Sequence, residues 1–252
     1  MLKTRVIPCL LLKDENLVKT VKFKKYNYIG DPVNTVRIFN ELEVGELMFL
    51  DIFSSLEKKD INFKMLQNIA NECFMPLSYG GNISCLDDAK QIFNIGFEKV
   101  VINSNSFINL NLISEISNYF GAQSVVGSLD TRRSFLGNSK VYSHHGSVKQ
   151  NYNAISWAKK LEEAGVGELL ITSIDREGSW NGYDIELIES ISKTVQVPVI
   201  ANGGCGSIQH IGEVVKKSGA SACAIGSMVV YQKKDMGVLV NFPDQVELAG
   251  VL

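Results

Sequence analysis

Short apolar segments alternate with longer amphipathic segments along this chain, and that alternation constrains the fold more than any other feature. The apolar segments predict eight strands, at residues 6–12, 46–52, 77–79, 99–102, 124–129, 168–174, 199–201 and 222–225. Between them, apolar residues recur every three or four positions, which predicts helices at residues 32–42, 87–95, 155–164, 185–194 and 208–218. Strands that alternate with helices pair in parallel, and eight such units in about 250 residues are typical of a closed (β/α)8 barrel.

We expect one α/β domain covering residues 1–252, because no linker or low-complexity segment divides the chain and its five prolines are dispersed. An open, doubly wound sheet is the alternative. Such a sheet usually has fewer strands or a GxGxxG fingerprint, which this sequence lacks. The longest non-periodic part, residues 132–152, is interpreted as a loop after the fifth strand, with a small hairpin at residues 140–143.

One half of the sequence resembles the other at a constant offset. PLSYGGNIS, which starts at Pro76, is similar to PVIANGGCGS, which starts at Pro198. Three features recur 123 positions later: Gly80-Gly81 as Gly203-Gly204, Gly96 as Gly219, and Asn103-Ser104 as Gly226-Ser227. All βα units share some similarity, but a single offset across half the chain favours two half-barrels, at about residues 1–120 and 121–252.

The repeated glycines follow short strands and predict turns that bind anions. A glycine at the carboxyl end of a strand lets backbone N–H groups approach a ligand without a Cβ in the way, and helix starts add further donors. The second half contributes Gly203, Gly204, Gly226 and Ser227, and the first half contributes Gly80, Gly81, Asn103 and Ser104. Two sites on one face predict a ligand with a phosphate at each end. The alternative is that the glycines only make tight turns.

Three aspartates, Asp51, Asp130 and Asp175, follow predicted strands. The barrel would place them at its carboxyl-terminal rim, where partial burial raises the pKa of a carboxyl into a range useful for general acid or base catalysis. Helix N-capping is the alternative role for an aspartate at such a junction.

The first loop is basic, and it predicts either a mobile lid that carries positive charge toward a phosphorylated ligand or a solvated loop. Lys19 joins Asp51 and Asp175 among the candidate ligand-binding residues. The lysines of this loop are Lys13, Lys19, Lys22, Lys24 and Lys25.

Four charged residues precede or begin strands, at the opposite end of the predicted barrel. They are Arg5, Glu46, Lys99 and Glu168. Two positive and two negative side chains would form a ring of salt bridges there, and this end of a barrel usually serves stability.

Composition excludes several classes of protein. There are 25 basic and 27 acidic residues, so we expect neither a nucleic-acid nor a membrane partner. Five cysteines without a CxxC motif, no apolar span of 18 residues and an N-terminus unlike a signal peptide indicate a cytoplasmic protein. The three histidines have no metal-ligand spacing, so we expect neither a metal nor another cofactor.

Together these motifs resemble the HisF family, the cyclase subunit of imidazole glycerol phosphate synthase, over essentially the whole chain. The resemblance is carried by RVIPCLLLKD, GDPV, ELMFLDI, GFEKVVINS, VVGSLDTRR, GELLITSIDREGSWNGYD, PVIANGGCG and ELAGVL. It implies a (β/α)8 barrel that receives ammonia from a HisH-like glutaminase at its amino-terminal end. The ammonia then reacts with a bis-phosphorylated ribulosyl aminoimidazole-carboxamide ribonucleotide at the other end.

The resemblance also implies roles for individual residues. Asp130 falls on one of two catalytic aspartates, and Gly178 joins the second-half phosphate site. Arg5, Glu46, Lys99 and Glu168 fall on the ring at the ammonia entrance.

The chain departs from the family at the other catalytic aspartate, where PCLL places Leu11. Smaller departures are Asn82 in the phosphate turn and Phe53 where the family has threonine. Three interpretations follow. The chain is a cyclase that is impaired or uses Asp14 or Asp51, or it is a paralogue that supplies ammonia to an amidotransferase, which makes acetamidino sugars of surface polysaccharides. The third interpretation is a non-catalytic barrel that activates its glutaminase.

Overall fold

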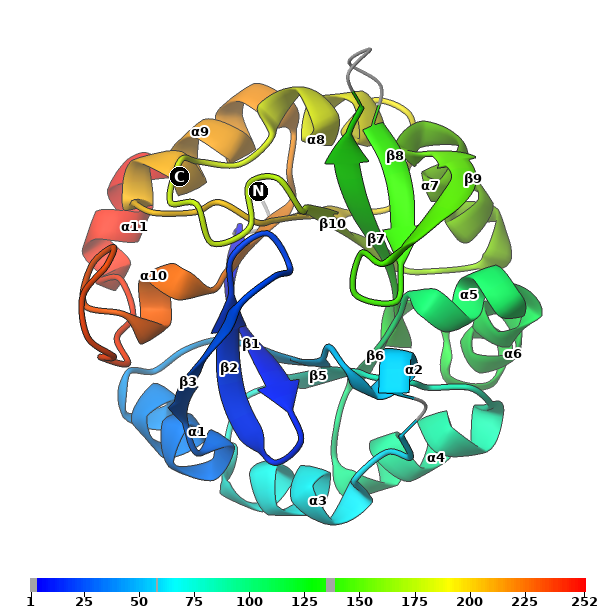
Figure 1. The fold of residues 1–252 in the computed structure, drawn as a ribbon, viewed down its shortest axis with the longest axis horizontal. Helices are drawn as coiled ribbons and strands as arrows, with labels where there is room; N and C mark the ends of the chain where they lie inside the picture. Colours follow the sequence, from blue (N-terminus) through cyan, green and yellow to red (C-terminus); the bar gives the residue numbers. More distant parts are fainter. Residues whose placement is uncertain (1–3, 58, 135–138) are drawn as a thin grey trace.

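A computed structural model describes residues 4–57, 59–134 and 139–252. In these residues eight parallel strands close into a barrel surrounded by helices (Figure 1), which confirms the predicted (β/α)8 fold. The strands follow the order β10-β11-β12-β1-β4-β5-β6-β7, and pairing of β10 with β7 closes the barrel. They are β1 (Arg5–Lys13), β4 (Leu47–Asp51), β5 (Leu77–Gly80), β6 (Lys99–Ile102), β7 (Val125–Arg133), β10 (Glu168–Ser173), β11 (Val199–Asn202) and β12 (Ala222–Ile225).

The helices form the outer layer, and all five predicted ones are present to within two residues at each end. Local signals start and stop them: in α7 the side chain of Asn153 accepts a hydrogen bond from the Ser156 backbone, and Gly165 ends the helix in the left-handed conformation. The full set is α1 (Pro32–Glu41), α2 (Ser54–Glu57), α3 (Phe63–Glu72), α4 (Leu86–Ile95), α5 (Ser104–Ile108), α6 (Asn111–Phe120), η1 (Ala122–Ser124), α7 (Ala154–Ala164), α8 (Ile185–Ser192), α9 (Ile208–Ser218), α10 (Ser227–Val230) and α11 (Gln245–Val251).

The apolar core has two parts, because side chains alternate between the two faces of each strand. On β10, Leu169 packs outward among the helices, whereas Leu170 points into the barrel, and both are fully buried. Burial on both faces is the reason that these strands read as nearly continuous apolar runs in the sequence.

Two antiparallel extensions lie on the carboxyl-terminal side of the barrel. β2 (Asn16–Thr20) and β3 (Tyr26–Gly30) continue from β1, and β8 (Ser139–Ser143) and β9 (Val148–Asn153) continue from β7. The interpretation of residues 132–152 as mainly a loop is therefore wrong in the described part, although residues 135–138 lie outside it. The basic first loop also contains two strands, of which β2 pairs with β1 and β3 pairs with β2.

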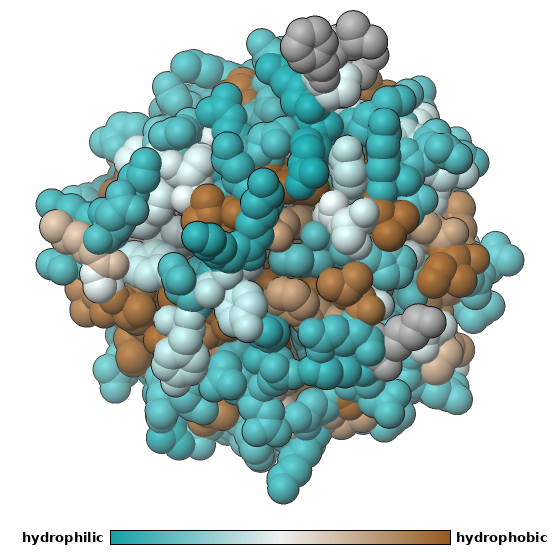
Figure 2. All heavy atoms as spheres, viewed as in Figure 1, coloured by the Kyte–Doolittle hydropathy of each residue, from teal (hydrophilic) through white to brown (hydrophobic). Residues whose placement is uncertain are grey.

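Figure 2 shows the face that carries these extensions, with hydrophilic side chains over most of it and smaller hydrophobic areas near its centre and rim. Exposed apolar residues also occur elsewhere, and Phe74, at 89% exposure, is the extreme case among the described residues. None of the helices described for this chain has the length and apolar character needed to cross a bilayer.

Candidate functional site

A cavity at the carboxyl-terminal end of the barrel brings both halves of the chain together. Of the thirteen residues predicted as catalytic or ligand-binding, twelve line it and one does not. The twelve are Lys19, Asp51, Gly80, Gly81, Asn103, Ser104, Asp130, Gly178, Gly203, Gly204, Gly226 and Ser227.

The second-half turn depends on glycine. Gly203 and Gly204 have φ angles of 91° and 105°, and a Cβ at Gly204 would collide with the carbonyl of Gly182. The side chain of Lys19 reaches this half of the cavity, because its Nζ would be in contact with a Cβ built at Gly226. A positive charge beside two glycine turns gives this half the character of an anion site.

The first-half turn has a related but different geometry. Asn103 and Gly226, which precede the short helices α5 and α10, have nearly the same backbone angles (φ −123°, ψ −90° and φ −119°, ψ −86°). The left-handed residue of the first turn, however, is Asn82 with φ 48°, and its side chain donates to the Lys59 carbonyl at 2.8 Å. The two turns are thus similar at the helix starts and dissimilar at the glycine pairs.

Asp130 lies at the centre of a buried polar network. Its Oδ2 accepts a hydrogen bond of 2.7 Å from Asn103, and the Thr172 hydroxyl also bonds to it. Thr172 Oγ1 in turn accepts a bond of 3.0 Å from Asn202. Burial raises the pKa of Asp130 to about 7, although these hydrogen bonds act in the opposite direction. A carboxyl with this pKa can both give and take a proton near neutral pH.

Lys19 and Glu177 form a second polar group, of which the sequence analysis found only the lysine. Both side chains are buried and line the cavity. Lys19 Nζ donates to the Cys9 carbonyl at 2.7 Å, and burial lowers its pKa. Burial raises the pKa of Glu177, whose Oε2 accepts a hydrogen bond from the Phe23 backbone at 3.2 Å. In the sequence, Glu177 lies two residues after Asp175, within a motif that carries the family resemblance, but no role was assigned to it.

Asp175 is the predicted residue that does not line the cavity. Its carboxylate accepts a hydrogen bond of 2.9 Å from the Arg133 backbone and lies 3.8 Å from Arg132 Nε. It therefore joins the end of β7 to the loop after β10, and Glu177 takes the inward position instead.

Of the two proposed substitutes for the missing aspartate, only Asp51 lines the cavity. Asp14 is exposed and ion-paired with Lys59, so it lies outside the cavity in this structure. Burial raises the pKa of Asp51, and its Oδ1 accepts hydrogen bonds from the backbone of Phe53 and Ser54, which is the capping role considered above.

Leu11 occupies the inner wall of the cavity with Leu50 and Ile52 nearby in the same apolar cluster. Its side chain is buried, and it lies on β1, across the barrel from Asp130 on β7. One wall thus carries a carboxyl group and the opposite wall carries a hydrocarbon.

Two aromatic side chains that line the cavity, Phe23 and His145, pack with a third, Phe53. His145, in the turn between β8 and β9, stacks on Phe23 at 4.9 Å and lies 4.8 Å from Phe53. Phe23 belongs to the turn between β2 and β3, so the two extensions are in contact through their turns, each of which contributes a side chain to the cavity lining. Lys22, Lys24 and Lys25 are exposed, so Lys19 is the residue of that basic segment whose charge reaches the cavity.

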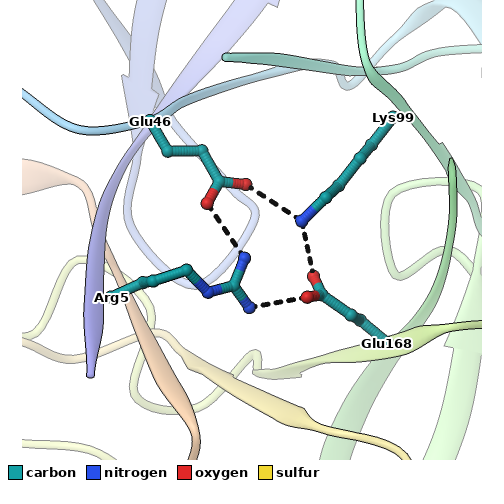
Figure 3. A network of polar contacts seen from close by, with 4 residues as sticks. All are labelled: Arg5, Glu46, Lys99 and Glu168. Carbon is teal, nitrogen blue, oxygen red and sulfur yellow. Dashed lines mark hydrogen bonds and ion pairs between the residues drawn. The ribbon is translucent and has the colours of Figure 1, made fainter. Parts of the chain in front are cut away.

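A closed ring of four charges lies at the other end of the barrel (Figure 3). Arg5 donates to Glu46 at 2.9 Å and to Glu168 at 2.7 Å, and Lys99 lies 3.5 Å and 3.1 Å from the same two carboxylates. Each residue stands at the start of β1, β4, β6 or β10, so the ring surrounds the axis of the barrel.

The described residues contain no group of three or more His, Cys, Asp or Glu side chains that could hold a metal ion. The five cysteines are free thiols. Burial raises the pKa of Cys9, which lines the cavity, to about 11, so this thiol is protonated near neutral pH.

Fold and site define a (β/α)8 barrel with a polar ligand cavity at its carboxyl-terminal face. A family model described as "Histidine biosynthesis protein" matches residues 5–235. The chain belongs to this family, and within it to the HisF proteins.

Three relatives show the range of similarity within the family. The chain is 49% identical over 244 residues to "Putative imidazole glycerol phosphate synthase subunit hisF2" of Pseudomonas aeruginosa, with 97% of each chain covered. It is 41% identical to "Putative imidazole glycerol phosphate synthase subunit HisF" of Leptospira borgpetersenii, with 97% of this chain and 96% of the other covered. It is 39% identical to the imidazole glycerol phosphate synthase subunit HisF of Methanococcus vannielii, with 94% of each covered.

Proposed function

We propose that this barrel accepts ammonia from a glutaminase subunit at its amino-terminal end and conducts it toward the ligand cavity at its carboxyl-terminal end. One observation carries the proposal: the ring of Arg5, Glu46, Lys99 and Glu168 is complete, whereas the cavity lacks one of the family's two catalytic carboxylates. Relatives named as subunits of a synthase support a partner protein.

The barrel interior favours ammonia over ammonium. Between the ring and the cavity, the inward side chains include Ile7, Met48, Val126, Leu170 and Ile200. A charged ammonium ion would be strongly disfavoured among them, whereas neutral ammonia can pass through small fluctuations of the packed side chains. The free thiols fit a reducing compartment, so we place the protein in the cytoplasm.

The cavity supports binding of a phosphorylated ligand more strongly than cyclisation. Glycine turns from both halves and Lys19 supply groups for phosphates at two ends of a ligand. Asp130 can transfer protons near neutral pH, but Leu11 cannot, and loss of a general acid or base typically costs about 10²–10⁴-fold in rate. We therefore favour a HisF-like paralogue that supplies ammonia to a separate amidotransferase.

The second candidate is the cyclase reaction of histidine biosynthesis. It is favoured by Asp51 and Glu177, two further carboxylates that line the cavity and whose pKa values burial raises. A barrel that only binds and activates its glutaminase is the third candidate, and it would not need this polar cavity.

Charge reversal at Lys99 tests the ammonia route. The full chain is coexpressed with a HisH-like glutaminase, and complex formation and glutamine-driven ammonia transfer are measured. Lys99→Glu places a third carboxylate in the ring, so we expect transfer to fall by roughly 10-fold or more. Lys90→Glu is the matched control, because Lys90 lies on the outer helix α4, where it ion-pairs with Asp87 and lies over the ring of Tyr119. Wild-type transfer by Lys99→Glu would contradict the route.

A further inference from the structure

We infer that the imidazole of His145 contacts the bound ligand and accepts a hydrogen bond from one of its N–H or O–H groups, away from the phosphates. This role rests on the proposed function, because it takes the cavity as the ligand site. His145 lines that cavity, and its turn reaches over the barrel opening (Figure 1).

Contacts from three segments fix the position of the His145 ring. The neighbouring backbone N–H of His144 donates to Ser104 Oγ at 2.9 Å, which ties the turn to the start of α5. His144 and His145 both have left-handed backbones, with φ of 50° and 54°, which histidine tolerates better than most residues. Phe23 and Phe53 then hold the ring from two sides.

One nitrogen of the ring lacks a hydrogen-bond partner. His145 Nε2 is shielded from solvent and has no partner among the described residues. The Phe23 backbone acts on the ring so as to raise its pKa, as a carbonyl facing a ring N–H does, and because Nε2 has no partner we assign that N–H to Nδ1. In a neutral imidazole with its proton on Nδ1, Nε2 carries a lone pair and is an acceptor. Burial lowers the pKa of His145 to about 4, so the ring is neutral at pH 7.

The missing donor fits a ligand in the cavity. A buried acceptor without a partner destabilises a protein, and such groups usually mark a site that a ligand or water completes. Phe23 and Phe53 offer no side-chain donor, so a donor reaches Nε2 from the cavity side. A phosphate monoester dianion carries no N–H or O–H, whereas a sugar hydroxyl or an amine does.

Asn103 supplies a second, independent acceptor of the same kind. Its Nδ2 donates to Asp130, but its buried Oδ1 has no partner in the described part of the chain. The cavity thus combines turns that suit phosphates with two unpaired acceptors that suit donors. This combination fits a phosphorylated compound rich in hydroxyl or amino groups, of the ribonucleotide class.

His145→Phe tests the role, because phenylalanine keeps the aromatic contacts and removes both nitrogens. Binding to the full chain is measured by calorimetry with two probes, sulfate, an anion without an O–H group, and the bis-phosphorylated ribulosyl aminoimidazole-carboxamide ribonucleotide. We expect the ribonucleotide to bind roughly 10-fold more weakly and sulfate to bind as in the wild type. Val148→Ala, on the same hairpin but exposed, serves as the control and should leave both affinities unchanged.

A second measurement uses the wild type, so it does not depend on whether phenylalanine tolerates the left-handed backbone at position 145. In the wild type, the ¹⁵N resonance of His145 Nε2 should move on addition of the ribonucleotide and stay in place with sulfate. Equal ribonucleotide affinities for wild type and His145→Phe, or an unmoved resonance, would overturn this role and leave the proposed function standing. Equal loss of sulfate and ribonucleotide binding would assign the ring to the anion site and also overturn it. A wild type that does not bind the ribonucleotide would overturn this role, and a wild type that binds neither probe would also overturn the use of the cavity as a ligand site.

Discussion

Leu11 and Asp130 face one cavity from opposite strands, and only one of them can transfer a proton. Leu11→Asp should therefore raise ammonia-dependent cyclase activity from a very low level by about 10²-fold or more, if the missing carboxylate is what limits the reaction. The measurement is a steady-state assay with ammonia and the ribulosyl substrate. Leu11→Asn, which adds polarity without an acidic proton, is the control. Wild-type turnover at about 1 s⁻¹ or faster would instead return the chain to histidine biosynthesis.

Burial of Asp130 predicts a pH-dependent cost to stability. Its pKa is about 7 in the folded chain and 3.8 for the unperturbed group, so the folded state keeps a proton that the unfolded state loses. The contribution is fully present below about pH 4 and falls as the pH rises to about 7. Relative to Asp130→Asn, the wild type should lose about 2 kcal/mol of unfolding free energy between pH 5 and pH 7.

Urea unfolding at several pH values measures this difference. Asp175→Asn is the matched control, because that carboxylate is partly exposed and bonds to the Arg133 backbone at the rim. If the free energy of unfolding of the wild type changes with pH in parallel with that of Asp130→Asn over this range, the carboxyl of Asp130 titrates normally.

Individual site residues were predictable where they directly follow a strand. Asp51, Asp130 and the glycine pairs have that signal, and they line the cavity. Asp175 has the same signal but turns outward, because Arg132 and Arg133 at the end of β7 offer it partners. Glu177 and His145 were missed because both are positioned by contacts with Phe23, more than a hundred residues away in the sequence, and His145 also depends on a hairpin turn. No local sequence pattern indicates such contacts.

The β11 turn gives a prediction at the scale of a structural element. Gly204 combines a left-handed backbone with a position where a Cβ would meet the Gly182 carbonyl, so Gly204→Ala should destabilise the fold by roughly 2 kcal/mol or more. Gly250 lies in α11 with open space around it, and Gly250→Ala should be neutral or stabilising by up to about 1 kcal/mol. Chemical denaturation compares the two, and equal effects would mean that the turn readjusts at little cost.

Regular elements were predictable where hydrophobic periodicity decides them. All eight barrel strands overlap their predicted ranges, since each is an apolar run buried on both faces. The helices α3 and α6 were missed although Met65, Leu66 and Ile69 have helical spacing and Asn62 caps the start of α3. Strands β2 and β3 have a weaker local signal, because β3 contains two exposed tyrosines and its stability depends on pairing with β2, which in turn pairs with β1.

The two ends of the molecule differ in chemistry. The carboxyl-terminal end presents a polar cavity beneath two hairpin turns, and the amino-terminal end presents a paired ring of charges. Next to that ring, the segment between α3 and β5 exposes Phe74 almost completely. Asn40 holds the backbone of this segment, since its side chain accepts from the Phe74 N–H at 3.2 Å and donates to the Glu72 carbonyl at 2.6 Å.

An aromatic ring that is exposed on a fixed backbone is well suited to anchor a partner, because little conformational freedom is lost on binding. A glutaminase that docks on the charged ring would also reach Phe74. This residue lies just before β5, and β5 pairs with β4, which follows Glu46, and with β6, which begins at Lys99. Phe74→Ala should weaken the complex by roughly 10-fold or more, and the free energy of unfolding of the isolated chain should change by less than about 0.5 kcal/mol.

Calorimetric titration of the glutaminase into wild type and variant measures that change in affinity, and thermal unfolding measures the change in stability. Ile108→Ala is the matched control, because Ile108 is 75% exposed but ends α5, on the carboxyl-terminal side of the barrel. A partner that docks at the amino-terminal end should respond to Phe74 and not to Ile108. If both variants bind with wild-type affinity, the interface lies away from this segment; if only Ile108→Ala weakens binding, the partner covers the ligand cavity, and ammonia would not need to cross the barrel.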